Sequence, residues 1–208
     1  MKLTGETKVF LGILVATVAI IGIAVFFISK PAPPPTPLPR EELVAAGSHT
    51  IGNASASAYL VEFSDFQCPA CQAFAPIVDE LATKYADKLL FVYRHYPLSQ
   101  PQYAKPAAMA AEAAGEQGKF WEMSKLLFSN QDKFSTAPWG SLADELKLER
   151  VKFDAALNSQ DLKAKIDRDE VAAIQLKLPG TPSFFLNGVR LEVTSPLDLK
   201  TAVEKAIQ

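Results

Sequence analysis

The hydrophobic positions divide the chain into one long apolar stretch near the N-terminus and a series of shorter patterned segments after it. Residues 9–28 run for 20 positions without a charged side chain, which is long enough for a helix that crosses a bilayer. Short apolar runs at 59–63, 89–94 and 183–186 are typical of buried strands. Between the first two runs, apolar residues recur at helical spacing, at Phe74, Ile77, Val78, Leu81 and Tyr85.

The order of these segments predicts an α/β fold. A strand, a helix and a strand in succession form a β-α-β unit, whose two strands we expect to be parallel with a right-handed crossover. After this unit the pattern is helical from 102 to about 177, which is too long and too helical for a loop. Asn187-Gly188 then predicts a hairpin into 189–193, and an amphipathic helix at 197–207 closes the fold. The helices expected in the long segment lie near 107–114, 120–128, 142–146, 151–157 and 162–176.

The segment that follows the apolar stretch is rich in proline, with six prolines in residues 31–39. We interpret it as an extended linker that reaches roughly 25–30 Å, and a ligand for a proline-binding domain is the alternative. A cleaved signal peptide is the alternative to an uncleaved anchor, but Lys30 and the prolines stand where a small-x-small cleavage site would be expected. The expected organisation is a cytoplasmic tail at 1–8, a transmembrane anchor at 9–28, a linker at 29–47 and a folded domain at 48–208.

The charge of the folded part argues against nucleic acid as a partner. Residues 41–208 contain 17 basic and 22 acidic side chains, and no basic patch with interleaved aromatic residues stands out. The sequence has no glycine-rich phosphate loop and no internal repeat.

Cys68 and Cys71 are the only cysteines in the chain, and they stand where a helix begins after the first strand. The thiolate is the nucleophile in disulfide exchange, and unpaired N–H groups and the helix dipole favour the thiolate at such a position. Pro69 suits the first helical position, because its missing N–H is no loss there. Cys71 lies one turn further on, close enough to attack a mixed disulfide on Cys68. The spacing therefore predicts a redox-active dithiol.

The alternatives to a redox-active dithiol are a zinc site, a purely structural disulfide and a pair of inert core cysteines. A zinc site needs four ligands, and the chain adds only His49 and His95, which are 46 residues apart and unlike the short spacing of zinc-binding histidines. A purely structural disulfide across two residues constrains the unfolded chain little. The third alternative is a pair of inert core cysteines.

Two motifs resemble the DsbA-like branch of the thioredoxin superfamily, over roughly residues 48–207. They are Glu62-Phe63-Ser64-Asp65-Phe66-Gln67-Cys68-Pro69-Ala70-Cys71 and Gly180-Thr181-Pro182-Ser183-Phe184-Phe185-Leu186-Asn187-Gly188. The resemblance implies a thioredoxin-like fold with an inserted helical subdomain. It also implies a cis bond between Thr181 and Pro182, in a loop that faces the cysteines and pairs with an extended substrate segment.

The resemblance assigns roles to individual residues. Cys68 is expected to be the attacking nucleophile and Cys71 the resolving thiol, with Pro69, Ala70, Thr181 and Pro182 beside the substrate. Glu62 is expected to be a proton acceptor, because burial on a central strand raises the pKa of a carboxyl and the family carries a buried acid at the matching place.

Three further polar residues are expected to be structural. We interpret Asp65 as a turn or capping residue, His95 as a packed or hydrogen-bonded residue rather than a proton carrier, and His49 as a surface or strand-edge residue without a role. Trp139 follows Pro138 in an expected turn and is a weaker candidate for the substrate groove.

Together these features predict a single-pass membrane protein whose catalytic domain lies outside the cytoplasm and exchanges disulfides with exported proteins that contain cysteines. The balance of positive charges around the anchor is close to even, so the orientation rests partly on the oxidising compartment that such a dithiol requires. No metal or bound cofactor is implied, and we expect a monomer that a membrane quinone reductase reoxidises.

The direction of electron flow is open from the sequence. The best-known oxidants of the family carry Pro-His between the cysteines, and this chain has Pro69-Ala70, which lacks the charge that stabilises the thiolate. We favour an oxidase over a reductase or isomerase of the same fold. A peptide-binding, chaperone-like module without turnover is the alternative outside the enzymes.

Overall fold

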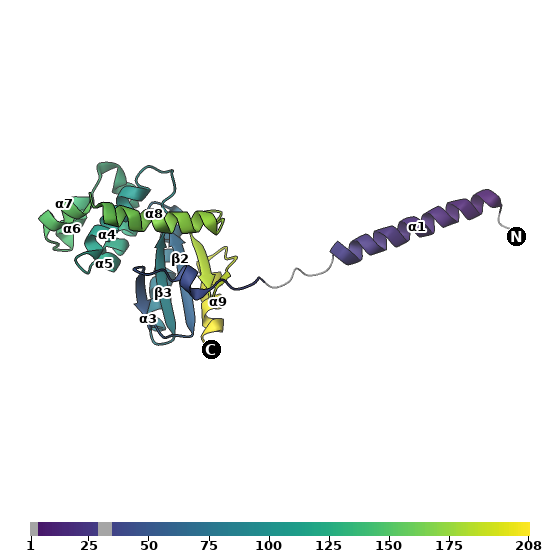
Figure 1. The fold of residues 1–208 in the computed structure, drawn as a ribbon, viewed down its shortest axis with the longest axis horizontal. Coiled ribbons are helices and arrows are strands. Elements are labelled where there is room, and N and C mark those ends of the chain that lie inside the picture. The colour runs from purple at the N-terminus through teal and green to yellow at the C-terminus, as the bar shows by residue number, and fades with distance from the viewer. Residues whose placement is uncertain (1–3, 29–34) are drawn as a thin grey trace. The chain divides into compact units, whose positions relative to one another are not determined.

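The computed structural model describes residues 4–28 and 35–208, and the chain divides into two units, Met1–Pro35 and Thr36–Gln208. In the first unit, α1 (Gly5–Ile28) is one continuous helix (Figure 1). Its segment Val9–Phe26 has a mean hydropathy of 2.9, and none of it is buried against other residues. By length and composition this segment could cross a membrane. The predictions for residues 1–3 and 29–34, including the first part of the proline tract at 31–34, fall outside the described residues.

The second unit is built on a five-stranded sheet with the strand order β1-β3-β2-β4-β5. The two central strands are parallel, as the β-α-β pattern predicts, and every residue in both is buried. Apolar and aromatic side chains fit this buried, pleated surface. The strands are β1 (His49–Gly52), β2 (Ala58–Ser64), β3 (Leu89–His95), β4 (Ser183–Leu186) and β5 (Val189–Arg190).

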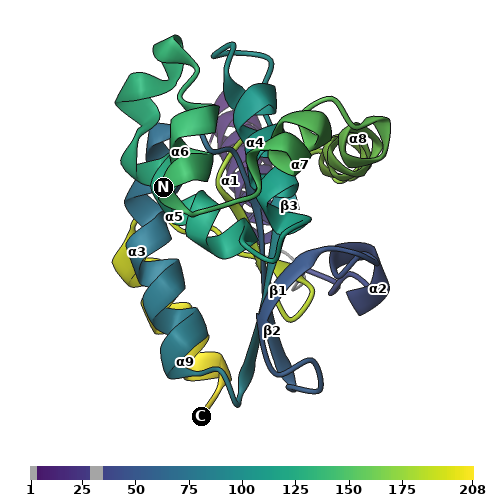
Figure 2. The same ribbon diagram turned by 90° about the vertical axis from the view of Figure 1, so that its left-hand side faces the viewer.

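Two layers of helices cover the sheet (Figure 2). On one face, α3 (Pro69–Lys84) and α9 (Pro196–Ala206) pack on Leu60, Phe91 and Phe184. On the other face, Val61, Phe63 and Val92 pack beneath α2 (Arg40–Leu43) and the C-terminal end of α8. Successive strand residues therefore belong to opposite cores, as the period of two requires.

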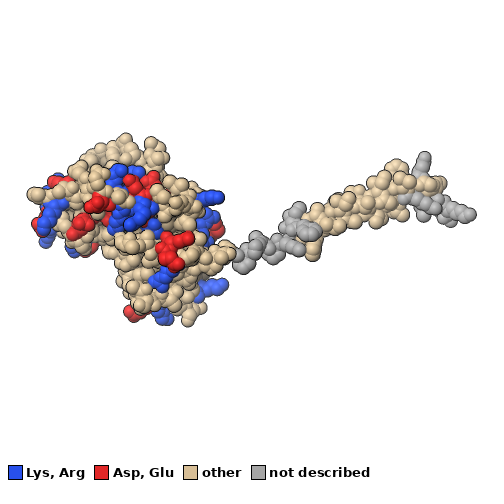
Figure 3. Space-filling model, in the orientation of Figure 1, with Lys and Arg blue, Asp and Glu red and all other residues tan. Residues whose placement is uncertain are grey.

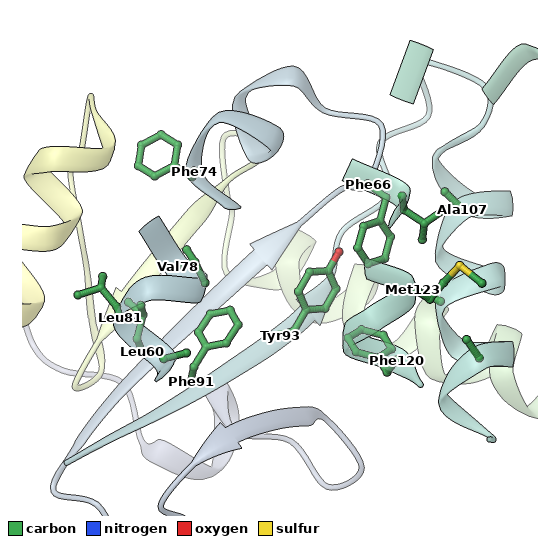
Figure 4. Packing of buried hydrophobic residues seen from close by; sticks show 14 of the residues in the cluster. Leu60, Phe66, Phe74, Val78, Leu81, Phe91, Tyr93, Ala107, Phe120 and Met123 are labelled. Carbon is green, nitrogen blue, oxygen red and sulfur yellow. The ribbon is translucent and has the colours of Figure 1, made fainter. Parts of the chain in front are cut away.

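A helical subdomain is inserted between β3 and β4, as expected. Its alanine-rich helix α4 (Ala104–Gly115) has fully buried alanines that allow close packing, and Figure 4 shows Ala107 beside Phe66, Phe120 and Met123. A 3-10 helix, η1, was not predicted, because its polar sequence has no apolar period. The remaining elements are α5 (Phe120–Ser129), η1 (Gln131–Thr136), α6 (Trp139–Glu145), α7 (Arg150–Ala156) and α8 (Gln160–Gln175).

Three local expectations differ from the structure. The strand after the Asn187-Gly188 turn ends at Arg190 instead of continuing to 193. Trp139 is the first residue of α6 and not part of a turn. Leu43, in the segment expected to be linker, is fully buried on the sheet, because α2 supplies apolar cover for a face that would otherwise be open.

The surface of the second unit carries mixed charge. Lys and Arg side chains are interspersed with Asp and Glu on the face seen in Figure 3. Many form surface pairs, such as Lys163 with Asp167 and Arg150 with Asp154.

Candidate active site

The start of α3 holds the two cysteines. Cys68 is the N-cap residue in extended backbone geometry, and Pro69 occupies the first helical position. Cys68 is half-buried, whereas Cys71 is fully buried on the side of the helix that faces the sheet. Pro69 and Ala70 are exposed beside Cys68, so a partner protein could reach this thiol but not the second one.

The surroundings of Cys68 favour its thiolate. A hydrogen bond from the Cys71 thiol lowers the pKa of Cys68 to about 5, against burial, which raises it. The Thr181 hydroxyl and the backbone N–H groups of Ala70 and Cys71 also lower it, as expected for a thiol at a helix N-terminus. Cys68 is therefore largely ionised at neutral pH.

Cys71 has the opposite character. Burial raises the pKa of Cys71 well above its ordinary value, and its hydrogen bond to Cys68 and the negative charges of Glu62 and Cys68 raise it further. The two thiols thus differ strongly in acidity although they share one helical turn. One is a ready nucleophile, and the other must lose its proton before it can react.

The loop before β4 lies against Cys68. The Thr181–Pro182 peptide bond is cis, and the Cys68 Sγ lies 3.3 Å from the carbonyl oxygen of Thr181, to which the thiol donates. This contact spans more than a hundred residues of sequence. It forms because β4 pairs antiparallel with β2, which places the entry of β4 next to the end of β2 and the turn that follows.

Glu62 and Ser64 lie beneath α3 on the same face of β2, since they are two residues apart on one strand. Burial raises the pKa of Glu62 to about 7, while a hydrogen bond from the Ser64 hydroxyl, 2.7 Å from Glu62 Oε1, lowers it and the charge of Cys68 raises it. Tyr93 stands in register with Glu62 on β3. Glu62 can therefore hold or release a proton near neutral pH, as the sequence predicts.

Glu62 also lines a pocket of about 380 Å³. Its walls are mainly apolar residues of α3, α5 and the sheet, among them Pro76, Phe91 and Trp121. Lys125 of α5 and Asp79 of α3, which also line it, form an ion pair of 2.8 Å between the two helices.

Polar contacts hold the turn between β2 and α3. Asp65 accepts hydrogen bonds from the backbone N–H of Gln67 at 2.7 Å and of Leu98 at 3.0 Å. It therefore serves the backbone of the turn, as expected, and does not face a substrate position. Gln131 of η1 donates to the carbonyl oxygens of Phe66 at 2.8 Å and of Cys68 at 3.1 Å. The insert thus clamps the turn that carries the nucleophile.

The two histidines meet away from the cysteines. His95 Nε2 lies 2.8 Å and His49 Nε2 lies 3.0 Å from Oε1 of Glu112 on α4, and Lys165 of α8 lies 2.8 Å from Oε2. His95 is thus a hydrogen-bonded structural residue, as expected. His49 begins the edge strand β1, as expected, but its ring also contacts Glu112 and Lys165. Because both rings point to Glu112, they are not placed to complete a zinc site with the cysteines. Trp139 packs edge-on against Phe134, 5.0 Å between ring centres.

Sequence reasoning missed three residues of the site. Ser64 was quoted only as part of a motif, yet its position two residues after Glu62 places it on the same face. Tyr93 stood in an apolar run that gives no sign of a polar role. Gln131 could not be found, because its contact with the active-site turn depends on how the insert folds back.

The curated proteins that are similar to this chain in sequence are much longer than it is. The chain is 35% identical over 188 residues to the Na(+)/H(+) antiporter NhaA 1 of Mycolicibacterium vanbaalenii and 41% identical over 143 residues to the Na(+)/H(+) antiporter NhaA 3 of Salinispora tropica. The matches cover 86% and 68% of this chain but only 30% and 22% of those proteins. The chain therefore spans less than a third of the relatives' length, and their names describe much longer proteins.

Solved structures with a similar fold align with this chain over nearly all of their own length. A thioredoxin-like oxidoreductase from Silicibacter pomeroyi is 26% identical, with a TM-score of 0.72 over 81% of this chain and 98% of that chain. The thiol-disulfide exchange protein α-DsbA2 of Wolbachia pipientis, at 18% identity, has a TM-score of 0.70 over 80% and 91%. BdbD of Bacillus subtilis, also at 18%, has a TM-score of 0.68 over 86% and 99%.

These similarities agree with the site. The inserted helices, the cysteine pair at a helix start and the cis-proline loop belong to a fold that this chain shares with the Silicibacter oxidoreductase and with α-DsbA2. The family model described as Thioredoxin matches residues 45–205, which is most of the chain. The chain therefore belongs to the thioredoxin family.

Proposed function

We propose that this chain is a membrane-anchored oxidase that introduces disulfide bonds into exported proteins outside the cytoplasm. The observation that carries the proposal is the unequal pair of thiols. Cys68 is accessible with a pKa of about 5, and Cys71 is buried with its pKa raised. In such a pair, the Cys68 thiolate reacts with the partner protein, and the Cys71 thiol stays protonated until it attacks a mixed disulfide on Cys68.

The oxidising reaction starts from the Cys68–Cys71 disulfide. A substrate thiolate attacks Cys68 Sγ, a new bond forms between the two sulfurs, and the electron pair of the broken bond stays on Cys71, which takes up a proton. A second substrate thiolate then attacks the substrate sulfur bound to Cys68. Cys68 leaves as a thiolate, and the substrate has lost two electrons. The redox equivalents reside in the cysteines themselves.

The cis-proline loop is the proposed place for the substrate backbone. Thr181 and Pro182 are half-buried opposite Cys68, and Pro69 and Ala70 are exposed on the other side. An extended peptide that pairs with the backbone of this loop would bring its cysteine over Cys68. Glu62 is the proposed group that exchanges a proton with Cys71.

The acidity of Cys68 supports the oxidising direction. A stabilised thiolate stabilises the reduced form, so the disulfide becomes the better oxidant. The pKa of about 5 lies between the values of about 7 for thioredoxin and about 3.5 for DsbA. The absence of a histidine at Ala70 is therefore partly offset by the Cys71 and Thr181 hydrogen bonds. A reductase or isomerase of the same fold is the alternative.

The location and partners follow from the same proposal. The apolar helix α1 supports a single-pass anchor, and disulfide formation belongs to an oxidising compartment. The substrates would be exported proteins with cysteines. A membrane quinone reductase would reoxidise the dithiol, and the enzyme would act as a monomer.

The reduction potential of the full chain in detergent tests the direction. It is measured in glutathione buffers of graded ratio, and we expect a value closer to about −120 mV, as for DsbA, than to about −270 mV, as for thioredoxin. A thioredoxin-like value would reverse the direction of electron flow. If a Cys68→Ser chain kept full biological activity, a chaperone-like module would replace the enzyme.

A further inference from the structure

We propose that Ser64 carries the proton between the Cys71 thiol and the Glu62 carboxyl. This inference rests on the proposed function and adds to it a residue that touches both groups. Because the Cys71 thiol is fully buried, the proton that it loses or gains must pass through a neighbouring group. Ser64 is also buried, with 1% of its surface exposed, so its hydroxyl is not occupied by bulk water.

The Ser64 hydroxyl contacts the Glu62 carboxyl on the face of β2 that carries α3. The Ser64 hydroxyl donates to Glu62 Oε1 at 2.7 Å, and both residues project from β2 toward α3. Cys71 is buried in the first turn of α3, and Ser64 is one of the groups that lower the pKa of its thiol. A serine hydroxyl has one proton to give and two lone pairs, so it can serve both neighbours in turn.

The other neighbours offer no comparable route. Ser64 also lowers the pKa of the Tyr93 hydroxyl, but burial raises that pKa well above its ordinary value, so Tyr93 does not take part as a base. On β4, the residue in register with Glu62 is the apolar Phe184. The titratable and charged groups around the pair are Tyr93 and His95 from β3, Cys68 and Cys71 from α3, Asp65 from the turn, and Asp79 and Lys125 in the pocket.

The step balances as a simple shift of protons. When Cys71 attacks a mixed disulfide on Cys68, its S–H proton passes to the Ser64 oxygen while the hydroxyl proton passes to the Glu62 carboxylate. The Cys71 thiolate then forms the sulfur–sulfur bond, and the partner leaves as a thiolate. In the oxidising direction the same protons move back. Glu62 is suited to both directions, because its pKa of about 7 is close to neutral.

The experiment follows the two steps separately on the full chain in detergent. The reduced chain reacts with one equivalent of an aromatic disulfide that releases a coloured thiolate. A first release reports the attack by Cys68, and a second release reports the attack by Cys71 on the mixed disulfide. A relay through Ser64 affects the second release only. The rates are measured from acid to alkaline pH.

Four variants separate the hydroxyl from the packing. Ser64→Ala removes the hydroxyl, and Ser64→Val and Ser64→Thr have nearly the same shape but differ in the hydroxyl. Ser124→Ala is the matched control, since this buried serine lines the same pocket while its hydroxyl donates to Phe120 O of its own helix.

At neutral pH we expect the Ala and Val variants to slow the second release about 100-fold, while the Thr variant and the control stay within about threefold of the parent chain. At alkaline pH, where hydroxide removes the Cys71 proton directly, the difference should shrink. In a Glu62→Gln chain, the added Ser64→Ala change should slow the second release no further, because both residues serve one path.

The outcomes distinguish the relay from the proposed function. Equal second-release rates for the Val and Thr variants, or a Ser64→Ala chain with the parent rate and pH profile, would overturn the relay while the dithiol chemistry stands. If the parent chain itself shows no first release, Cys68 is not a nucleophile and the proposed function fails together with the relay.

Discussion

At the scale of single residues, the site depends on small differences in what each polar atom touches. The Thr181 hydroxyl is buried without a hydrogen-bond partner in the described part of the chain, and the Thr181 side chain lowers the pKa of Cys68. The sequence places Thr181 in the loop expected to face the cysteines, but it does not show that the Thr181 side chain acts on the acidity of Cys68. The hydroxyl can be removed with little change in shape.

We predict that Thr181→Val raises the pKa of Cys68 above about 5 by about one pH unit, because the thiolate loses a donor and the neutral thiol does not. The ultraviolet absorbance of the thiolate, followed against pH, measures the change. Thr201→Val on α9, whose hydroxyl donates to Leu197 O, is the control. An unchanged titration of the Thr181 variant would mean that the hydroxyl does not stabilise the thiolate.

Glu62 makes stability depend on pH. Its carboxyl takes up a proton near pH 7 in the folded chain and near 4.5 when unfolded, so the folded state binds more protons between these values. The free energy of unfolding therefore falls as pH rises through this range. Relative to a Glu62→Gln chain, we expect the parent to lose about 3 kcal/mol between pH 4 and pH 8.

Urea unfolding of both reduced chains at the two pH values measures this difference. The low pKa of Cys68 acts in the opposite sense, with stability rising from about pH 5 upward, but it is present in both chains and largely cancels. Parallel pH dependence of the two chains would show that Glu62 has an ordinary pKa.

At the scale of elements, the strands and most helices could be predicted, whereas the contacts between them could not. The apolar runs of β2 and β3 and the spacing of α3 are local signals, and they place the dithiol correctly. His49 illustrates the limit. It is an isolated polar residue in the sequence, and only the pairing of β1 with β3 and the docking of α4 and α8 bring it to Glu112.

The Glu112 cluster joins the sheet to the inserted helices. Burial raises the pKa of Glu112, but hydrogen bonds from His49 and His95 outweigh burial and hold the pKa well below its ordinary range. We expect Glu112→Gln to lower the free energy of unfolding by about 3 kcal/mol, because Lys165 loses its buried counter-ion. Urea unfolding tests this.

The matched control is Glu122→Gln. Glu122 pairs with Lys119 on the exposed surface of the same subdomain, so its loss should change the free energy of unfolding by less than about 1 kcal/mol. Similar losses for Glu112 and Glu122 would show that the buried cluster adds nothing beyond an ordinary surface ion pair.

At the scale of the whole molecule, the two units differ in the surroundings that they suit, a membrane for α1 and water for the folded unit. The folded unit resembles proteins that exchange disulfides, and α1 has the length and composition of a membrane span. The sequence indicates both parts, but the nearly even distribution of positive charge around residues 9–28 leaves the orientation to experiment. Labelling of cysteines can determine this orientation, since Cys68 and Cys71 are the only cysteines in the sequence.

We predict that a membrane-impermeant maleimide labels Cys68 in intact cells after treatment with an impermeant reductant. Cys68 is half-buried and largely a thiolate at neutral pH, so it should react quickly, whereas the buried Cys71 should not. A Cys68→Ser chain controls for reaction at Cys71. Labelling that requires permeabilised cells would place the dithiol in the cytoplasm, where the oxidase direction loses its basis. A labelled chain that is shorter and released from the membrane would instead identify residues 9–28 as a cleaved signal peptide.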